Sequence, residues 1–405
     1  MKKRLLVIMQ FLVVLCMAAT ADVINVSPAT NLQVAIDAAK SGDVIMLETG
    51  DYYVPSEEGA PSSINIRKDI TITSGAQRAN IRGFFRIYDG ASLTVSHLTI
   101  DGSNNVLLDQ IFNYKLDQAP EGTAFGPLTV DDCIIKGNTL NTKGLIYLNI
   151  NSVVESIHIN NSIVHDIHCS GGDFIDSRKG LPKEVKLTNS TFYDVAQRDF
   201  IRIDDQSSAF PGEDAPKVTV DHCTLIGVGG DITYRLMYIR FVGNSIVFTN
   251  NFSAYTGYRR GFTNQQNTDS NPTLGNNYYY CCTNLVTPEE NADANIRWFD
   301  ENGTVMNVSP FLYSDYPPLN QDSPYFNLSD ESSVSQANAG DPRWLSLNVL
   351  TSLNLSKADV MPAHNVCYTL SGQRLSQPLR KGIYIVRSDE GRLHGKNGCK
   401  VVIKK

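Results

Sequence analysis

A nine-residue pattern recurs through the middle of the chain and restricts the folds open to it. Each copy has two alternating apolar residues, a polar turn residue and further apolar residues, as in "SLTVSHLTI" at 92–100. The leading apolar residues fall at positions 93, 128, 157, 185, 218 and 246, so the intervals are 35, 29, 28, 33 and 28 residues. Short alternating segments indicate half-buried strands, and recurrence near 30 residues is typical of stacked coils rather than hairpins.

A second series of apolar segments lies between the copies of the first. Its members are "FFRIYDG" (84–90), "IFNYKLD" (111–117), "LIYLNIN" (145–151), "FIDSRKG" (174–180), "FIRIDDQ" (200–206) and "YIRFVGN" (238–244). Each coil therefore holds at least two strands at a fixed phase. A third strand is expected, although no clear sequence pattern marks it. We predict an all-β protein built as a parallel β-helix, in which each coil stacks its strands on the next.

Polar residues at the turn of the first series form a predicted ladder of their own. Its members are His97, Asp132, Asn161, Asn189, His222 and Asn250. Such side chains can satisfy backbone groups of neighbouring coils, so a structural role is favoured over catalysis. Cys133 and Cys223 share the next position and are expected in the core. The cysteines number eight, with no CxxC spacing, which argues against a zinc site or a disulfide scaffold.

The N-terminus has the pattern of a signal peptide, predicted at residues 1–21. A positive start at 1–4 precedes an apolar run and an A-x-A cleavage site at 19–21, so the mature chain begins near Asp22. No other stretch approaches the ~20 apolar residues of a membrane span, and we expect none in the mature chain. A formal net charge of −7 lacks the excess of positive charge that is typical of nucleic-acid-binding proteins. Local basic patches can still hold an acidic glycan.

Residues 31–54 are expected to cap the first coil with a helix followed by a strand. They follow an AI-x-x-A-x-x-GD-x-I-x-L-x-x-G-x-Y pattern through Ala35, Ile36, Ala39, Gly42, Asp43, Ile45, Leu47, Gly50 and Tyr52. This pattern resembles the beginning of the first coil in the pectin-lyase-like superfamily of right-handed β-helices. The resemblance implies a right-handed solenoid over 22–344, with an N-terminal cap helix. It also implies a groove for extended polysaccharide along one sheet.

Two further resemblances concern the middle and the end of the chain. "GDFIDSRKG", "NSTFYDVAQRDFIR", "HCTL" and "GDPRW" (340–344) resemble a family of uncharacterised secreted β-helix proteins of Bacteroidota, over roughly 80–345. Residues 366–405 resemble the C-terminal sorting domain of the type IX secretion system, through Gly372, Lys381, Gly382 and Tyr384. That resemblance implies delivery to the medium or outer surface by the secretion machinery. The alternative is a small β-sandwich accessory domain; in either case 345–365 are the linker.

The second strand series predicts a row of outward side chains on successive coils, about 4.8 Å apart. The row comprises Arg86, Asn113, Tyr147, Asp176, Arg202 and Arg240. A neighbouring row two residues further on comprises Tyr88, Lys115, Asn149, Arg178, Asp204 and Val242. The two rows together predict a groove for an acidic polysaccharide.

A lyase for uronic acids must neutralise the sugar carboxylate and remove the proton next to it. The predicted catalytic residues are Arg202 as base or neutraliser and Arg240 as neutraliser. Lys179, with Arg178 and Tyr147, is predicted to support them. A hydrolase would instead use two carboxylates, Asp176 with Asp204 or Asp205.

The residues leave other interpretations open, and whether the chain is an enzyme is one of the open points. Asp176 beneath Arg202, and Arg178 beneath Asp204, can form a cross-strand ion-pair ladder without any substrate. Non-catalytic glycan binding and a purely structural surface solenoid also fit. No cofactor is predicted, and Ca²⁺ is left open at Asp204 and Asp205 with Asp173 or Asp176. Aromatic residues at 276–282 and 311–318 favour packing of the last coil over sugar stacking.

Overall fold

The computed structural model describes most of the chain between residues 21 and 404. The described residues are 21–54, 63–103, 110–137, 143–229, 234–257, 262–263, 272–282, 296–297, 303–312, 326–345, 366–368, 374–375, 382–387 and 399–404. The chain divides into two compact units, Met1–Val349 and Leu350–Lys405. The predicted signal peptide and linker lie outside the described residues, apart from Ala21 and Leu345.

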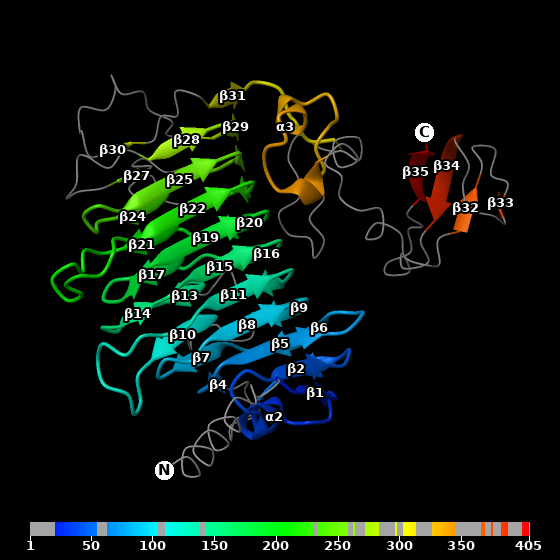
Figure 1. Ribbon diagram of the computed structural model, residues 1–405. Coiled ribbons are helices and arrows are strands. Elements are labelled where there is room, and N and C mark those ends of the chain that lie inside the picture. Colours follow the sequence, from blue (N-terminus) through cyan, green and yellow to red (C-terminus); the bar gives the residue numbers. More distant parts are fainter. Residues whose placement is uncertain are drawn as a thin grey trace, which may run out of the picture. The chain divides into compact units, whose positions relative to one another are not determined.

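Three long sheets form the first unit, and their strands stack coil upon coil (Figure 1). Sheet I comprises β1 (Val23–Val26), β2 (Val44–Leu47), β5 (Ile70–Ser74), β8 (Leu93–Ser96), β11 (Leu128–Asp131), β15 (Ile157–Asn160), β19 (Glu184–Thr188), β22 (Lys217–Asp221), β25 (Ser245–Thr249) and β28 (Thr273–Gly275). Sheet II comprises β3 (Asp51–Tyr52), β6 (Ala79–Arg82), β9 (Leu98–Asp101), β12 (Ile134–Lys136), β16 (Ile163–Ile167), β20 (Thr191–Val195), β23 (Thr224–Ile226), β26 (Phe252–Ala254), β29 (Tyr278–Tyr280) and β31 (Thr304–Met306). Sheet III comprises β4 (Ile64–Ile66), β7 (Phe85–Tyr88), β10 (Phe112–Lys115), β13 (Ile146–Tyr147), β17 (Ile175–Ser177), β21 (Ile201–Ile203), β24 (Met237–Ile239), β27 (Phe262–Thr263) and β30 (Ile296–Arg297).

The chain visits sheets I, II and III in turn and then begins the next coil. Neighbouring strands pair in parallel throughout sheets I and II, and in sheet III up to β27, which pairs with β30 in antiparallel fashion. The first unit is therefore a right-handed parallel β-helix, the handedness that crossovers between parallel strands take. The predicted fold class is confirmed. β14 (Val153–Val154) and β18 (Leu181–Pro182) add a short parallel pair outside the three sheets.

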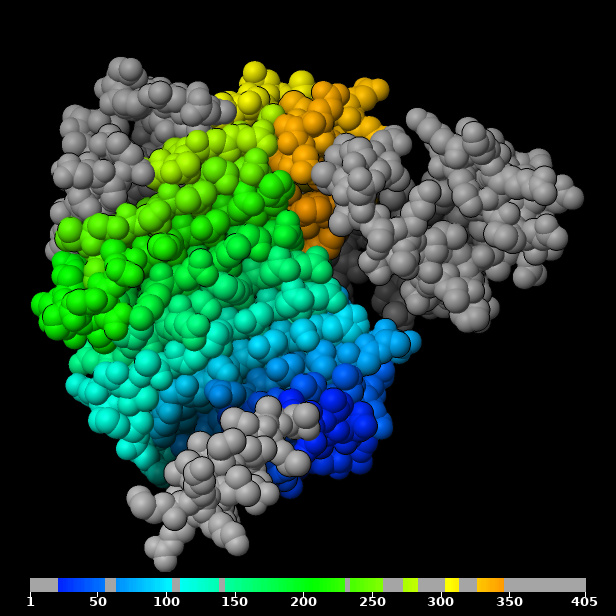
Figure 2. Space-filling view, in the orientation of Figure 1, coloured from blue at the N-terminus to red at the C-terminus, as the bar shows by residue number. Residues whose placement is uncertain are grey.

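Apolar side chains fill the interior because every second residue of each strand points inward. In sheet I the inward row runs through Leu93, Leu128, Ile157 and Val185, all fully buried. Equivalent inward positions of sheet III stack directly, as the parallel rings of Phe85 and Phe112 show with centroids 5.4 Å apart. The alternating pattern of the sequence is thus the pattern of burial. Figure 2 shows the outer face of sheet I as an unbroken surface on which successive coils lie as parallel bands.

The predicted turn ladder has a backbone cause. His97, Asp132, Asn161, Asn189, His222, Asn250 and Asn276 all have φ between 48° and 55°. This left-handed conformation is open mainly to Gly, Asn, Asp and, less often, His, whose short polar side chains bond locally. One such residue turns the chain from sheet I into sheet II. The third strand of each coil, which the sequence analysis expected without placing it, is therefore the second half of the nine-residue repeat.

The N-terminal end of the solenoid is covered by α2 (Leu32–Ala38), as the sequence predicted. Leu32, Ala35 and Ile36 are buried, and the Asn31 side chain caps the helix by accepting from the Gln33 N–H at 2.9 Å. Asp43 closes the following turn by accepting the N–H groups of Lys40 and Asp22. These two hydrogen bonds, that of Lys40 first, hold the pKa of Asp43 below its usual value.

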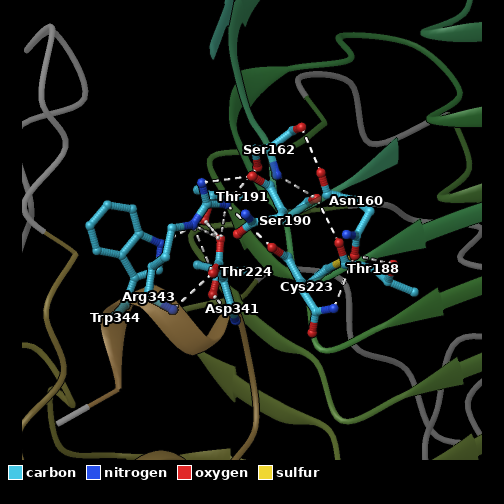
Figure 3. A network of polar contacts seen from close by, with 12 residues as sticks. Asn160, Ser162, Thr188, Ser190, Thr191, Cys223, Thr224, Asp341, Arg343 and Trp344 are labelled. Carbon is cyan, nitrogen blue, oxygen red and sulfur yellow. Dashed lines mark hydrogen bonds and ion pairs between the residues drawn. The ribbon is translucent and has the colours of Figure 1, made fainter. Parts of the chain in front are cut away.

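A returning segment, residues 326–345, packs on the outer face of sheet II with α3 (Ser333–Gln336) and the 3₁₀ turn η1 (Pro342–Trp344). Apolar side chains of sheet II, among them Ile226, Ala254 and Tyr280, face it and are buried. The aromatic residues Tyr280 and Phe311 thus pack at the last coils, whereas 313–318 lie outside the described residues. Asp341 and Arg343 anchor the segment in a polar network with Thr191 (Figure 3).

The second unit contains β32 (Val366–Tyr368), β33 (Arg374–Leu375), β34 (Gly382–Arg387) and β35 (Cys399–Lys404). They form one antiparallel sheet in the order β33-β32-β34-β35. Gly382 and Tyr384 lie on β34, whereas Gly372 and Lys381 lie outside the described residues.

Candidate functional site

The register of sheet III decides which predicted site residues lie side by side. Arg86, Asn113, Tyr147, Asp176 and Arg202 are consecutive partners along β7, β10, β13, β17 and β21. The next partner is Tyr238, not Arg240. The prediction that Arg240 shares this row is wrong, because the sequence comparison aligned "FIRID" with "YIRFV" whereas the strands align Ile201 with Met237.

Arg240 belongs to the neighbouring row, two residues further along each strand. Tyr88 pairs with Lys115, and Asn149, Arg178 and Asp204 continue this row on the next coils. Ile203 pairs with Ile239, so the following residue, Arg240, lies beside Asp204, where the sequence analysis had expected Val242. The Arg240 Nη1 atom is 3.8 Å from the Asp204 Oδ1 atom.

Two members of the predicted row are not open to solvent. Asp176 is only 3% exposed because the Arg178 side chain folds over it, with Nε 2.9 Å from Oδ1. Asn113 is also buried, and its amide turns toward the buried side chain of Gln110 at 3.4 Å. The prediction of a fully solvent-facing row is therefore wrong at these two positions. Arg86 is half-buried over the ring of Phe84, and β10 and β13 separate it from Asp176.

Charged side chains gather on β17 and β21 and on the residues just before and just after β17, β21 and β24, and we call this group the arginine–aspartate cluster. Its members are Asp173, Asp176, Asp199, Asp204, Arg178, Arg198, Arg202, Arg235 and Arg240. The carboxylates lie underneath: the side chains of Asp173 and Asp199 are 0% and 1% exposed, whereas those of the arginines range from 12% to 34%. Five guanidinium groups over four carboxylates give a net charge of +1 when all are ionised.

Asp173 connects the cluster from below. One oxygen, Oδ2, is 3.0 Å from Arg178 Nη2 and 3.5 Å from Arg202 Nη1. The other, Oδ1, is 3.6 Å from Arg198 Nε. A single buried carboxylate thus shares its charge among three guanidinium groups, and this sharing holds them in fixed positions.

Ion pairs also run along single strands. Arg202 binds Asp204 with two nitrogens, Nε at 2.8 Å and Nη2 at 3.0 Å. Arg178 binds Asp176, as described above, also two residues apart. The expected pairing of Asp176 with Arg202, and of Arg178 with Asp204, across coils is therefore replaced by pairing within a strand. The contacts between coils are those of Asp173 with Arg198 and Arg202, of Asp199 with Arg235 and of Asp204 with Arg240.

Burial and mutual repulsion shift the pKa values of the acidic groups. Burial first, and the charge of Asp173 second, raise the pKa of Asp199 to about 6. The same two causes raise the pKa of Asp176. Burial alone would lower the pKa of Arg202, but the hydrogen bonds and charge of Asp204 outweigh it, so the pKa of Arg202 is raised. Arg202 therefore keeps its proton, and its geometry suits charge neutralisation rather than proton abstraction.

Aromatic rings lie among the guanidinium groups. The Tyr238 ring has the guanidinium carbons of Arg235, Arg202 and Arg240 at 3.8, 5.3 and 5.6 Å from its centroid. The guanidinium carbon of Arg198 lies 5.0 Å from the centroid of the Tyr234 ring. Rings in such contact fix the planes of the guanidinium groups.

Sequence reasoning missed Arg198, Asp199, Arg235 and Tyr238, and considered Asp173 only as a calcium ligand. A signal was present, because "DFI" occurs at both 173–175 and 199–201, so an acidic residue precedes the apolar pair on adjacent coils. The analysis compared the residues after the apolar pair and left those before it aside. The predicted residue Tyr147 lies on β13, and its Oη atom accepts from Asn149 Nδ2 at 2.7 Å. The predicted residue Lys179 lies in the turn after β17 and is exposed.

Within the described part of the chain, no three His, Cys, Asp or Glu side chains are grouped so as to hold a metal ion. Of the carboxylates considered for Ca²⁺, which also included Asp205, Asp173, Asp176 and Asp204 each contact a guanidinium group. A cation at this place would have to displace those contacts. Among the same residues, no helix is long and apolar enough to span a bilayer.

Comparison with known proteins gives two findings. The family model of a domain of unknown function, DUF4957, matches residues 50–195. Two solved structures of the PL6 family alginate lyase AlyGC, one of them a mutant, are similar with TM-scores of 0.36 and 0.38 at 15% and 17% identity. The similarity covers 71% of this chain but only 40% of those chains. No curated protein matches the sequence.

Proposed function

We propose that sheet III binds an acidic polysaccharide at the arginine–aspartate cluster and that the protein cleaves it by β-elimination, as polysaccharide lyases do. The observation that carries this proposal is the cluster itself, in which partly exposed guanidinium groups from three successive coils lie over buried carboxylates. Guanidinium groups match the planar geometry of carboxylates and keep their charge at any ordinary pH. A row of them favours a polymer that carries repeated negative charges.

The carboxylates of the cluster oppose the binding of an anion in one respect and support it in another. Arginine side chains lose much rotamer freedom when they bind a ligand, but here Asp173 and Asp204 hold them before a ligand arrives. Coils are spaced by about 4.8 Å, so Arg178, Arg202 and Arg240 extend over a distance comparable to two or three sugar units. A glycan chain running along the solenoid can therefore meet one guanidinium group after another.

In the proposed reaction the cluster neutralises the carboxylate of one uronic acid residue. A base removes the proton on the carbon next to that carboxylate, and the electron pair left behind forms a carbon–carbon double bond. The bond from the neighbouring carbon to the glycosidic oxygen breaks, and that oxygen takes up a proton. Arg240 and Arg202 supply positive charge, and Lys179 or Tyr147 is the proposed base.

Non-catalytic glycan binding is the second candidate, and a specific observation favours it. Each of the cluster carboxylates contacts a guanidinium group, and Asp199, whose pKa lies near neutrality, is buried. None of these carboxylates is both exposed and unpaired, which makes the hydrolase pairing of Asp176 with Asp204 poor chemistry. Binding without cleavage needs only the arginines.

The test is a panel of polysaccharides applied to the purified protein. Alginate belongs in the panel because the similar solved structures are alginate lyases by name; neutral glucans serve as controls. Ultraviolet absorbance of unsaturated uronides, abolished in Lys179→Met or Tyr147→Phe, supports cleavage. Retarded migration in affinity gels without any product supports binding alone. If no acidic polymer yields an unsaturated product and none retards the protein, both candidate functions are contradicted.

We also propose that the protein is exported and acts in the medium or on the outer surface. The signal-peptide pattern of residues 1–21 and the sorting-domain resemblance of 366–405 support this location, with the secretion machinery as a transient partner. Fractionation of cells that express the full chain, compared with a chain lacking 366–405, tests it. Retention of the full chain inside the cell contradicts the proposal.

A further inference from the structure

We infer that Arg198 hydrogen-bonds the anionic group of the ligand, while Arg202 adds positive charge to the site and acts as a positioning residue. The inference rests on the proposed function and deepens it, because it assigns separate roles to two neighbouring arginines. The recognised chemistry is a carboxylate or sulfate group on a glycan. The argument depends on how many guanidinium donors the protein itself already occupies.

Arg202 has little capacity left for a ligand. Its Nε and Nη2 atoms bind the two oxygens of Asp204, and its Nη1 atom donates to Asp173 at 3.5 Å. A ligand that took over these donors would leave a carboxylate of low exposure without its partner, which is unfavourable. Arg178 is committed in the same way, through Nε to Asp176 and Nη2 to Asp173.

Arg198 differs from both. Its closest described carboxylate oxygen, Asp173 Oδ1, is 3.6 Å from Nε, which is beyond hydrogen-bonding distance. Its Nε is buried, and among the described residues it has no hydrogen-bond partner. The side chain as a whole is 24% exposed. Arg198 therefore combines a full positive charge, access from solvent and donors that the described residues do not use.

The surroundings of Arg198 favour an incoming anion. Asp173 cannot neutralise it, because the same carboxylate also contacts Arg178 and Arg202 at shorter distances. The Tyr234 ring lies 5.0 Å from the guanidinium carbon and limits its rotation. A guanidinium group held in one plane with free donors can accept an anion through two parallel hydrogen bonds, the strongest arrangement it offers.

The experiment compares Arg198→Ala and Arg202→Ala with Arg82→Ala as the matched control. Arg82 pairs with Asp51 on sheet II, so its removal changes the net charge equally without touching sheet III. Calorimetric titration with a size-defined oligouronate, and with a sulfated oligosaccharide of the same length, gives the affinity. Thermal unfolding of each variant gives its stability.

We expect Arg198→Ala to weaken binding by about 10- to 100-fold, as befits a lost charge-assisted hydrogen bond, with an unfolding temperature close to that of Arg82→Ala. Arg202→Ala should lower the unfolding temperature more than either. Loss confined to the uronate identifies a carboxylate and loss confined to the sulfated sugar identifies a sulfate; both support the inference.

Two outcomes overturn the inference, and they are distinguishable. If the wild type binds a polymer and Arg198→Ala binds it as tightly, Arg198 is not the contact residue, and only this inference fails. If the wild type binds neither polymer, the proposed function fails and the inference falls with it. Arg198→Lys adds a further measurement, since a lysine keeps the charge but lacks the two parallel donors and should recover only part of the affinity.

Discussion

Two regions of the solenoid use arginine and aspartate in opposite ways. In the returning segment, Arg343 binds Asp341 and donates to the backbone oxygen of Ser162 (Figure 3). It also donates to the backbone oxygens of Asn161 and Asn189. In the cluster on sheet III, five arginines share four carboxylates, and Arg198 has no described hydrogen bond from its Nε. The first arrangement uses the hydrogen-bond donors of Arg343 within the protein. The second leaves donors of Arg198 that the described residues do not use. The difference separates an arginine that holds the fold from one that is available to a ligand.

The largest effect should come from Arg343→Ala. Asp341 is fully buried, and burial raises its pKa despite the opposing charge of Arg343. Removal of the guanidinium leaves this carboxylate without its charge partner and frees three backbone oxygens, at a cost of about 3–5 kcal/mol in the free energy of unfolding. Urea unfolding followed by circular dichroism measures it, with Arg82→Ala as control. A loss below about 1 kcal/mol would show that the segment is not anchored by this pair.

A smaller effect, and one that depends on pH, is expected from Asp199→Asn. Native Asp199 keeps its proton up to about pH 6, whereas an unfolded Asp releases it near pH 4. The native state therefore binds more protons in this window, so this group makes stability fall as pH rises from about 4 to 6. The groups facing it are Asp173, Arg235 and Arg202.

Asp199→Asn should remove this fall in the free energy of unfolding, which amounts to roughly 2–3 kcal/mol at neutral pH. The amide oxygen of the variant can still accept the backbone N–H of Arg235, as the Asp199 Oδ1 atom does at 2.8 Å. Unfolding free energies of wild type and variant at pH 4.5 and 7.5 give the comparison. Parallel pH profiles for the two proteins would mean that Asp199 does not titrate in this range.

The smallest effect should come from Asp204→Asn, and it sharpens the contrast between the two regions. The change weakens the hold on Arg202 and Arg240 and raises the charge of the cluster by one. Affinity for an acidic polymer should then increase by about two- to fivefold, the range of a partly exposed ion pair, and the gain should shrink at high salt. Asp51→Asn on sheet II is the matched control. Equal gains in both variants would mean that only net charge matters.

The sequence predicted the solenoid well and the site in part, for physical reasons that differ. Apolar alternation determines burial, so the rows of Leu93 and Phe85 could be placed without coordinates. The position of the third strand could not, because a single polar residue such as Asn161 does not reveal by its type that the backbone turns a corner there in the left-handed conformation.

Site residues were harder because their roles depend on contacts between coils. The expected place of Arg240 was wrong by two residues along the strand, since the lengths of the intervening segments conceal where a strand begins. Arg198 could not be separated from Arg202 by residue type at all. Only the distances to Asp173 and Asp204 show that one has committed its donors and the other has not.

The corner between sheets I and II has a consequence for how such a protein can change over generations. From β8 onward the backbone turns there on one left-handed residue, and the next strand begins within two residues of it. An inserted residue would shift the inside–outside alternation of everything that follows in that coil. Within this chain the differences in coil length accordingly fall in the segments before and after the strands of sheet III, so the variable loops border the one face where a glycan would be recognised.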